Sequence, residues 1–291
     1  MIEGPRSPSP GPTPRGAGRI PGWIPDWAIY LSVLAALVLI SLRLAEDADA
    51  PSGLPATAQA QAARLGPVTP FDLEVMVDAP DRAFQPSSGT AFSIDGRGRW
   101  VTARHVVEGC RRPALMVGGG RAVAAAFRLA PHADVAVLIT DGGPGSLPLR
   151  ALEPAVGQVA FHPGYPQGGA GEVSSRLLGY DRIRSPGRGR TTERVLAWAE
   201  MGRTKGLEGG LAGLSGAPAL DGSGRVVGVT IAAAPRRGRI YTTTPQAFLQ
   251  AVRGQADPAA VEAGPMTTAN YGRVADDLRR DLRVAQVVCL A

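Results

Sequence analysis

Three residues with complementary chemistry, His105, Asp134 and Ser215, occur in this order along the chain. Ser215 lies in the string GLSGAP, residues 213 to 218, where glycines allow a sharp turn that exposes the hydroxyl. A serine hydroxyl is a poor nucleophile near neutral pH and needs a base, and a neutral imidazole is suited to that pH. His105 can take the proton from Ser215 while Asp134 holds the other ring nitrogen protonated. The three residues therefore predict nucleophilic acyl transfer.

Each of these residues also has a simpler interpretation when taken alone. A single histidine is more often a packed or surface side chain, and a single aspartate or a Gly-x-Ser-Gly-x-Pro string is more often part of a turn. His132 and Asp141 compete for the same roles, but their positions indicate a turn residue and a strand terminator. His162 precedes a Pro-Gly pair and is expected to be a partly exposed loop residue.

The order of the three residues narrows the class of hydrolase. An Asp, His, Ser order and a Ser, acid, His order belong to two other hydrolase folds, and neither fits this chain. Ala217 also breaks the G-x-S-x-G pattern of the second of these.

The composition argues against several other kinds of function. The 3 histidines and 2 cysteines are too dispersed for any familiar zinc spacing, so we expect no metal. Neither a dinucleotide fingerprint nor a phosphate-binding loop is present, and no cofactor is expected. The formal charge of +6 comes from scattered arginines, with Lys205 the single lysine, which does not indicate a nucleic-acid partner.

The amino-terminal part of the sequence predicts a membrane anchor. Residues 1–22 are rich in proline, glycine and serine and are expected to form a disordered cytoplasmic tail. Residues 23–43 are predicted to be a transmembrane helix, because no charge occurs from Trp27 to Leu42. Arginines precede this segment and acidic residues follow it, so the amino terminus is expected in the cytoplasm and the rest in the periplasm or outside the cell.

Two alternatives to a retained anchor stay open. The apolar segment could be a buried core helix, or it could belong to a cleaved signal peptide ending at Ala48-Asp49-Ala50 or Ala58-Gln59-Ala60. A cleaved signal would also place the remainder outside the cytoplasm. Residues 44–67 are rich in alanine, glycine and proline and read as a linker.

From Val68 onward, short apolar runs alternate with glycine turns, as in GTAFSI, DVAVLIT and RVVGVTI. Such runs without long intervening helices are typical of an antiparallel barrel or sandwich. Two helices are predicted after these strands, in PQAFLQAV and in RVADDLRRDL. The second has Val274, Leu278 and Leu282 along one stripe.

Three sequence blocks carry a family resemblance. They are TARHV at 102–106, DVAV at 134–137 and GLSGAP at 213–218, and together they resemble the trypsin-like serine proteases of chymotrypsin fold. Within this family, the sequence most resembles the catalytic domains of bacterial HtrA-type proteases, and the resemblance extends from about Val68 to Gly254.

This resemblance implies a fold, a site and a substrate. The fold would be all-β, with two six-stranded antiparallel β-barrels and a C-terminal helix, in a protease domain at 68–255. Residues 256–291 would form an extension packed on that domain, too short for the PDZ domain that HtrA-type proteins usually carry. His105, Asp134 and Ser215 would be the catalytic triad, and the N–H groups of Gly213 and Ser215 the oxyanion hole. The substrate would be a protein or peptide; the sequence specifies no oligomeric state.

The chain departs from the family pattern beside the serine. Leu214 replaces the Asp or Asn that commonly precedes the nucleophile, so activation by N-terminal trimming is not expected. The substrate pocket would have Gly209 at its base and Thr230, Ile231 and Ala232 along its wall. Its small, mostly apolar lining favours a small or medium apolar residue before the cleaved bond.

Two further features remain open in the sequence. Outside the cytoplasm Cys110 and Cys289 could form a disulfide worth about 4 to 5 kcal/mol in the chain-entropy model, with two free buried thiols as the alternative. The basic stretch 181–194 is expected to be a solvated hairpin loop, with contact to anionic lipid as the minor alternative.

Taken together, these features predict a membrane-anchored serine endopeptidase. The alternative is a catalytically weak or inactive scaffold or binding protein of the same fold at the membrane.

Overall fold

The computed structural model describes residues 26–46, 74–75, 88–185, 191–234, 237–255, 260 and 263–290. The chain divides into two units, Met1–Leu44 and Ala45–Ala291. Helix α1 (Asp26–Glu46) is the described part of the first unit. Within the described residues we find no helix long and apolar enough to cross a membrane. The transmembrane helix at 23–43 therefore stays a prediction. The tail at 1–22, most of the linker at 44–67 and both cleavage motifs lie outside the described residues.

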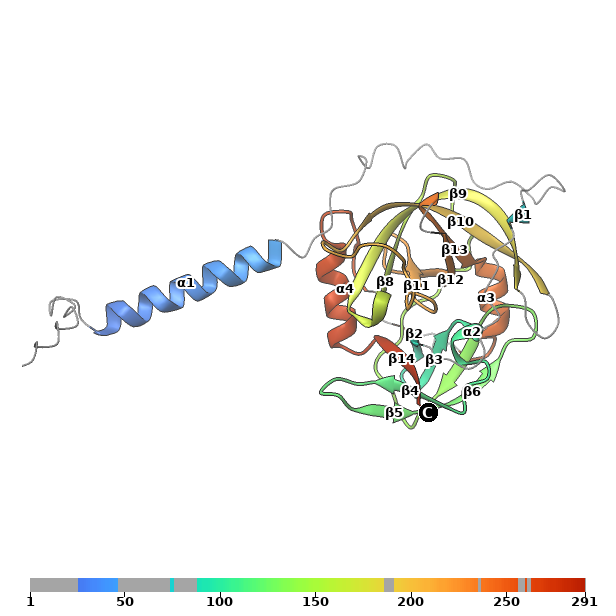
Figure 1. Ribbon diagram of the computed structural model, residues 1–291, viewed down its shortest axis with the longest axis horizontal. Coiled ribbons are helices and arrows are strands. Elements are labelled where there is room, and N and C mark those ends of the chain that lie inside the picture. Colours follow the sequence, from blue (N-terminus) through green and yellow to red (C-terminus); the bar gives the residue numbers. More distant parts are fainter. Residues whose placement is uncertain are drawn as a thin grey trace, which may run out of the picture. The chain divides into compact units, whose positions relative to one another are not determined.

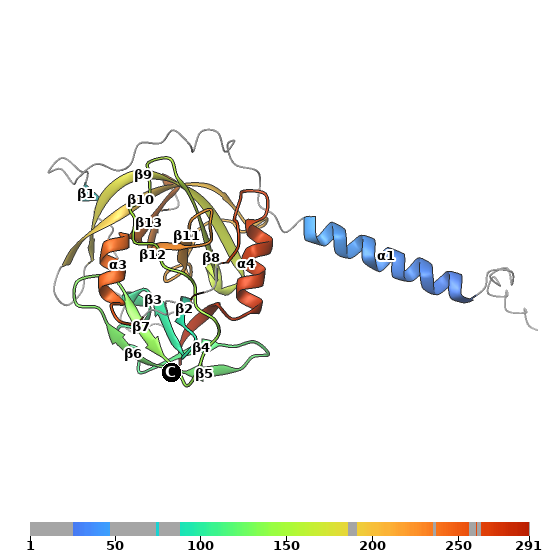
Figure 2. The same ribbon diagram turned by 180° about the vertical axis from the view of Figure 1, so that it is seen from behind.

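The second unit contains a closed barrel of antiparallel strands (Figures 1 and 2). Around the barrel the order is β8, β9, β10, β13, β12 and β11, and the β8–β9 and β11–β8 pairings close it. The bounds are β8 (Val159–Gly164), β9 (Gly171–Ser185), β10 (Thr191–Arg203), β11 (Pro218–Leu220), β12 (Val226–Ala234) and β13 (Arg239–Thr243). A short strand, β1 (Glu74–Val75), pairs with β9 in parallel. The all-β class and one six-stranded barrel are thus confirmed.

The other sheet corrects the prediction of a second six-stranded barrel. Its seven strands run in the order β5, β4, β14, β2, β3, β7 and β6, and the pairings among the described residues leave β5 and β6 as open edges. The bounds are β2 (Ser88–Asp95), β3 (Arg99–Thr102), β4 (Arg112–Met116), β5 (Ala122–Ala124), β6 (Ala126–Leu129), β7 (Ala136–Ile139) and β14 (Val284–Leu290).

The seventh strand explains the difference. Strand β14 comes from the extension at 256–291 and lies between β2 and β4, pairing with both in antiparallel register. The extension therefore contributes a strand to the interior of the sheet, where its N–H and C=O groups are satisfied on both sides. The helix predicted at the end of the protease domain is present as α3 (Pro245–Ala251), and β14 follows it in the extension.

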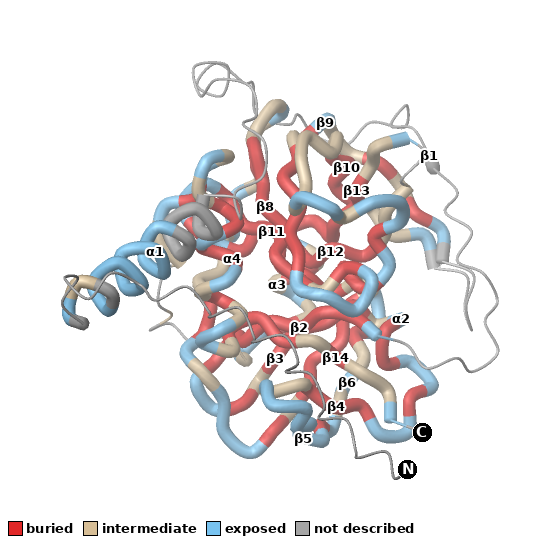
Figure 3. The backbone as a smooth tube through the Cα atoms, turned by 60° about the vertical axis from the view of Figure 1, so that its left-hand side comes forward, coloured by how far each residue is buried: buried red, intermediate tan, exposed pale blue. Residues whose placement is uncertain are grey.

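The buried core runs through both sheets (Figure 3). The larger apolar cluster includes Phe92 and Trp100 from the open sheet together with Phe161 and Tyr241 from the barrel. Strand β2 is buried along all of its length after Ser88, since both faces of the strand are covered. Shared burial of this kind holds the two sheets together, because separating them would return apolar area to water.

Both predicted carboxyl-terminal helices are present. Helix α3 (Pro245–Ala251) begins with Pro245 in its first turn, and the Thr244 hydroxyl caps it by accepting a hydrogen bond from Ala247 N at 3.2 Å. Helix α4 (Tyr271–Arg280) buries Val274 and Leu278, two of the three predicted stripe residues. Leu282 follows the helix with a positive φ of 56° and packs against the core from there.

A disulfide joins the sheet to the end of the chain. Cys110 follows His105 by five residues, Cys289 lies in β14, and the two sulfurs are bonded across a sequence separation of 179. The bond closes a loop that includes the barrel and both carboxyl-terminal helices.

Replacing both cysteines by serine should lower the stability of the protein. The chain-entropy model gives a loss of about 5 kcal/mol in the free energy of unfolding for a loop of this length. Denaturant unfolding of the oxidised wild type and of the C110S/C289S variant would measure it. Equal midpoints with equal slopes would contradict the expectation.

Candidate active site

Strand pairing brings His105 and Asp134 together. Strands β3 and β7 pair with Thr102 opposite Ala136, so the residues after Thr102 lie beside those before Ala136. His105 follows within α2 (Arg104–Val107), a single helical turn, and Asp134 lies in the turn before β7. Two residues 29 positions apart in the sequence thus reach the same end of one antiparallel pair.

The His105 ring and the Asp134 carboxylate form a hydrogen-bonded pair. His105 Nδ1 lies 2.7 Å from Asp134 Oδ2, and His105 backbone N–H donates to Asp134 Oδ1 at 3.0 Å. Burial of Asp134 tends to raise its pKa, but the charge and hydrogen bonds of His105 outweigh this and the pKa is lowered. An ionised carboxylate only accepts hydrogen bonds, so Nδ1 carries the proton and Nε2 is left to act as a base.

The hydrogen-bonded contact with Asp134 also shifts the pKa of His105. Desolvation tends to lower the pKa of His105, but the Asp134 charge and hydrogen bond exceed that effect and the pKa is raised above 6.5. The imidazolium formed after proton transfer is therefore stabilised. The side chain of His105 is 45% exposed, so a substrate can reach it.

Close backbone contacts position Ser215 beside the β3–α2 junction. Thr90 N–H donates to Ser215 O at 2.8 Å, and Gly216 N–H donates to Thr230 O at 2.7 Å. A Cβ atom on Gly216, which has φ +89°, would lie 2.0 Å from Thr90 O and 3.0 Å from Ala103 N. Only glycine fits there, and the resulting approach brings Ser215 to the end of the open sheet that carries His105. No hydrogen bond joins Ser215 Oγ to the His105 ring in the described residues, as is common without substrate.

The backbone of the serine turn presents two N–H groups. Neither Gly213 N–H nor Ser215 N–H has a hydrogen-bond partner within the part of the chain that the structure describes. Gly213 has φ +96°, and a Cβ atom on it would lie 2.4 Å from Tyr165 O. Its carbonyl oxygen accepts a hydrogen bond from Thr90 Oγ1 at 2.8 Å, which fixes the plane of the Gly213–Leu214 peptide. Paired donors of this kind can stabilise a developing oxyanion.

The residue between these two donors, Leu214, is part of the barrel core. It is 1% exposed and packs in a cluster with Ala160, Ala217 and Val227. Its side chain anchors the serine turn by apolar packing.

The four residues predicted for the substrate pocket are in different environments. Gly209 is exposed with φ +71°, and Ile231 and Ala232 pack on the larger core cluster. Thr230 is 1% exposed, and its hydroxyl lies 2.9 Å from His162 Nδ1. Its side chain therefore points into the barrel, and the assignment of these four residues to the substrate pocket stays a prediction.

His162 also differs from its expected place in a loop. It lies in β8, is fully buried and bonds Thr230 Oγ1 with Nδ1 and Ser175 Oγ with Nε2, the latter at 2.7 Å. Desolvation lowers its pKa to about 3, so it is a neutral structural histidine.

Glu193 contacts the triad pair and is absent from the sequence-based site. Its Oε2 accepts a hydrogen bond from Asp134 N–H at 2.7 Å, and its Oε1 is buried with no partner among the described residues. Burial raises its pKa to about 7, a rise that the hydrogen bond opposes and the Asp134 charge increases. Glu193 is the third residue of β10, the second strand of the β9–β10 hairpin, and lies 59 residues after Asp134, so no local pattern indicates this contact.

Substituting Glu193→Gln should change how stability depends on pH. The native carboxyl holds its proton up to about pH 7 and the ordinary value is 4.5, so native Glu193 binds more protons between these values. Wild-type stability therefore falls as pH rises through that window. Above pH 7 we expect E193Q to be more stable by up to about 3 kcal/mol, with little difference at pH 4. Unfolding measured at both pH values would test this, and an equal difference at both would contradict it.

The described residues contain no cluster of three or more metal-ligating side chains. The chemistry available at the site is that of the serine, the imidazole, the carboxylates and the two N–H donors.

An all-β fold in which a His–Asp pair on one sheet meets a serine turn from a closed barrel defines a chymotrypsin-like serine endopeptidase. A family model described as a trypsin-like peptidase domain matches residues 89–229, a range that contains His105, Asp134 and Ser215. Residues 89–229 therefore form a trypsin-like peptidase domain.

Several solved structures resemble the chain. The Rv3671c protease from M. tuberculosis, active form, is 22% identical over 71% of this chain and 98% of its own, with a TM-score of 0.47. The MamO protease domain from Magnetospirillum magneticum is 19% identical over 56% of this chain and 93% of its own, with a TM-score of 0.43. The HtrA-type protease AlgW with a decapeptide is 20% identical over 56% and 49%, with a TM-score of 0.44. No curated protein matches the chain.

Proposed function

We propose that the chain is a membrane-anchored endopeptidase that hydrolyses proteins outside the cytoplasm through a His105, Asp134 and Ser215 triad. The observation that carries the triad is the pair of hydrogen bonds from His105 to Asp134, which leaves Nε2 of the ring as the available base. The Ser215 turn lies against the junction that precedes His105, so the base and nucleophile come from adjoining elements.

The reaction follows from these roles. Ser215 Oγ attacks the scissile carbonyl while His105 Nε2 takes its proton, and the carbonyl oxygen becomes an oxyanion held by Gly213 N–H and Ser215 N–H. His105 then gives the proton to the leaving amine, and the C–N bond breaks to leave an acyl-enzyme. A water molecule, deprotonated by His105, attacks the acyl carbonyl and releases the new carboxylate with Ser215 restored.

A direct assay separates this function from its rival, an inactive scaffold. The purified chain should cleave an unfolded protein such as casein, and the S215A variant should not. Cleavage that persists in S215A would reject the triad, and no cleavage by wild type at any pH from 6 to 9 would favour the scaffold.

The membrane part of the proposal is supported by the sequence. The uncharged run from Trp27 to Leu42, with arginines before it and acidic residues after it, favours a retained span with the protease domain outside the cytoplasm. The full chain should stay in the membrane fraction after alkaline carbonate extraction. In spheroplasts, added protease should digest the domain after residue 68. Release by carbonate would reject the membrane anchor, and protection of the domain would reject its location outside the cytoplasm. Neither result would reject the proposed peptidase activity.

A further inference from the structure

A short turn between β8 and β9 supports the segment that leads to Ser215. This turn includes η2 (Pro166–Gly168), and its Gln167 N–H donates to Ala212 O at 2.5 Å. Gln167 Nε2 also donates to Gly210 O at 2.8 Å. Together with Tyr165 O, which lies against Gly213, these contacts hold the backbone just before the oxyanion donor.

The turn itself is in a conformation that needs support. Gln167 has φ 56° and ψ 21°, the left-handed region that residues with a side chain rarely occupy. Such a conformation persists where surrounding contacts determine it. The contacts that hold the two ends of the β8–β9 turn therefore help to maintain this conformation of Gln167.

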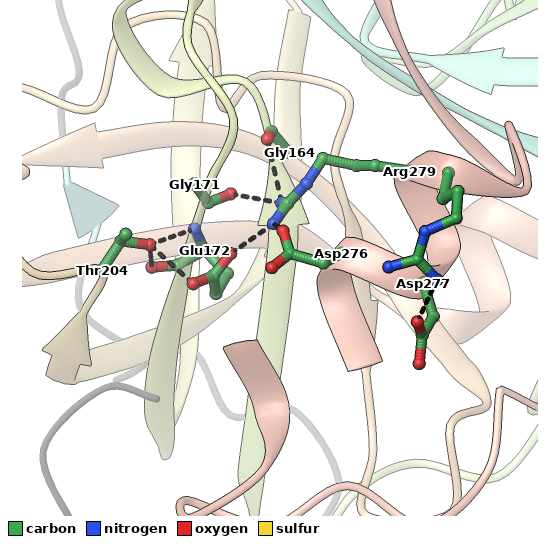
Figure 4. Close-up of polar contacts among 8 residues, drawn as sticks. Gly164, Gly171, Glu172, Thr204, Asp276, Asp277 and Arg279 are labelled. Carbon is green, nitrogen blue, oxygen red and sulfur yellow. Dashed lines mark hydrogen bonds and ion pairs between the residues drawn. The ribbon is translucent and has the colours of Figure 1, made fainter. Parts of the chain in front are cut away.

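Arg279 of α4 binds both ends of this turn (Figure 4). Its Nη1 donates to Gly171 O at 3.1 Å and to Gly164 O at 3.4 Å, the residues at which β9 begins and β8 ends. A planar guanidinium presents donors from separate nitrogens, so it can bind two carbonyl groups with one nitrogen and a carboxylate with another, whereas lysine has a single terminal nitrogen. Gln286 of β14 adds a weaker contact, from Nε2 to Gly168 O at 3.4 Å.

A buried ion pair fixes the arginine in place. Arg279 Nη2 lies 2.8 Å from Glu172 Oε2, and the two side chains are 8% and 3% exposed. The second oxygen of Glu172 accepts from Thr204 Oγ1 at 2.7 Å, and Asp276 Oδ1 also binds Arg279 Nη2. Burial raises the pKa of Glu172, although Arg279 and Thr204 oppose that rise. Removing one partner would leave the other charge buried without compensation.

Leu214 shows why the segment that leads to Ser215 needs support from the β8–β9 turn. Its side chain lies in apolar surroundings and carries no charge or hydrogen-bonding group that could fix the adjoining peptides. The polar restraints on the backbone of 208–213 come from Thr90, from the β8–β9 turn and from Arg203, whose Nη1 donates to Gly209 O at 3.0 Å. Of these, only the β8–β9 turn bonds Ala212 O, which belongs to the same peptide as Gly213 N–H.

We propose that Arg279 is a positioning residue for catalysis, through which α4 holds the β8–β9 turn and so keeps Gly213 N–H directed at the reacting carbonyl. The proposal rests on the proposed oxyanion role of Gly213. The carboxyl-terminal extension, which follows the segment that matches the peptidase family, is then part of the working site.

Three variants test the proposal. In R279Q the contacts to Gly164, Gly171 and Glu172 are lost, and kcat per titrated active site should fall about 10-fold to 100-fold with KM within about twofold of wild type. R279K keeps a charge for Glu172 but cannot reach both carbonyls, so we expect an intermediate fall in kcat. R280Q is the matched control, since Arg280 pairs with Asp277 on the exposed side of the same helix and its side chain is 70% exposed. It should behave as wild type.

Active-site titration distinguishes a loss of positioning at the active site from a loss of folded protein. Active-site titration counts the folded, acylable molecules, so a merely less stable protein would lose titrated sites and keep kcat per site. Affinity for a peptide boronate, which forms a tetrahedral adduct, should fall with kcat across the series. If wild type is active and both R279Q and R279K keep kcat per site within twofold, the proposal is overturned; if R279Q does not fold, R279K decides. If wild type is never acylated, the proposed function fails and this inference fails with it.

Discussion

His105→Ala and Ser215→Ala should each lower kcat by about 10⁶, and the double variant should be no slower than either single one. The hydroxyl is a useful nucleophile only while a base removes its proton, and His105 protonates the leaving amine only after Ser215 has attacked. Because the two groups act as one unit, removing the second costs nothing further. Peptide hydrolysis by all three variants, measured at saturating substrate, would test the loss and its non-additivity.

Matched controls distinguish this result from general damage. His132→Ala removes an exposed histidine two residues before Asp134, and Ser223→Ala removes an exposed turn serine that, like Ser215, is followed by a glycine. Both should retain kcat within about twofold, as surface substitutions usually do. A fall in the double variant that equals the product of the single effects would show that His105 and Ser215 act separately.

Asp134→Asn should lower kcat by about 10⁴ while leaving the fold intact. Asp134 accepts from both the backbone N–H and the ring Nδ1 of His105, and an amide offers only one oxygen for these two donors. If the amide oxygen keeps the backbone bond, its NH₂ group faces Nδ1, and the ring proton moves to Nε2. The histidine then presents a donor to Ser215 where a base is required.

The matched control for D134N is the D141N variant. Asp141 is an exposed aspartate just after β7, and the same substitution there should leave kcat unchanged. D134N should also lower the pH at which the remaining activity rises, since the neighbouring charge that raises the His105 pKa is gone. Equal activity of D134N and wild type would remove Asp134 from the triad.

The sequence predicted the parts of the fold that depend on local pattern. Apolar runs with glycine turns indicated an all-β domain, and the barrel from β8 to β13 has that form. The helix predicted in PQAFLQAV is α3, and the Val274 and Leu278 spacing indicated α4. Each of these signals acts within a few residues, which is the range over which backbone propensity and amphipathic burial are determined.

The parts that were missed depend on contacts between distant segments. Strand β14 forms because β2 and β4 offer free edges to it, and nothing within VAQVVCL specifies those partners. His162 was expected to be a partly exposed loop residue, but it is buried in β8, where its ring bonds the Thr230 hydroxyl inside the barrel. Glu193 reaches Asp134 from a hairpin of the other sheet, so its role depends on how the two sheets pack.

The central claim is that Ser215 is a nucleophile activated by His105, and labelling with a fluorophosphonate tests it most directly. The probe should add once per chain to wild type, and peptide mapping should find it on Ser215. Labelling should disappear in S215A, fall sharply in H105A and persist in S223A. Wild type that remains unlabelled, or a label that persists in S215A, would contradict the account.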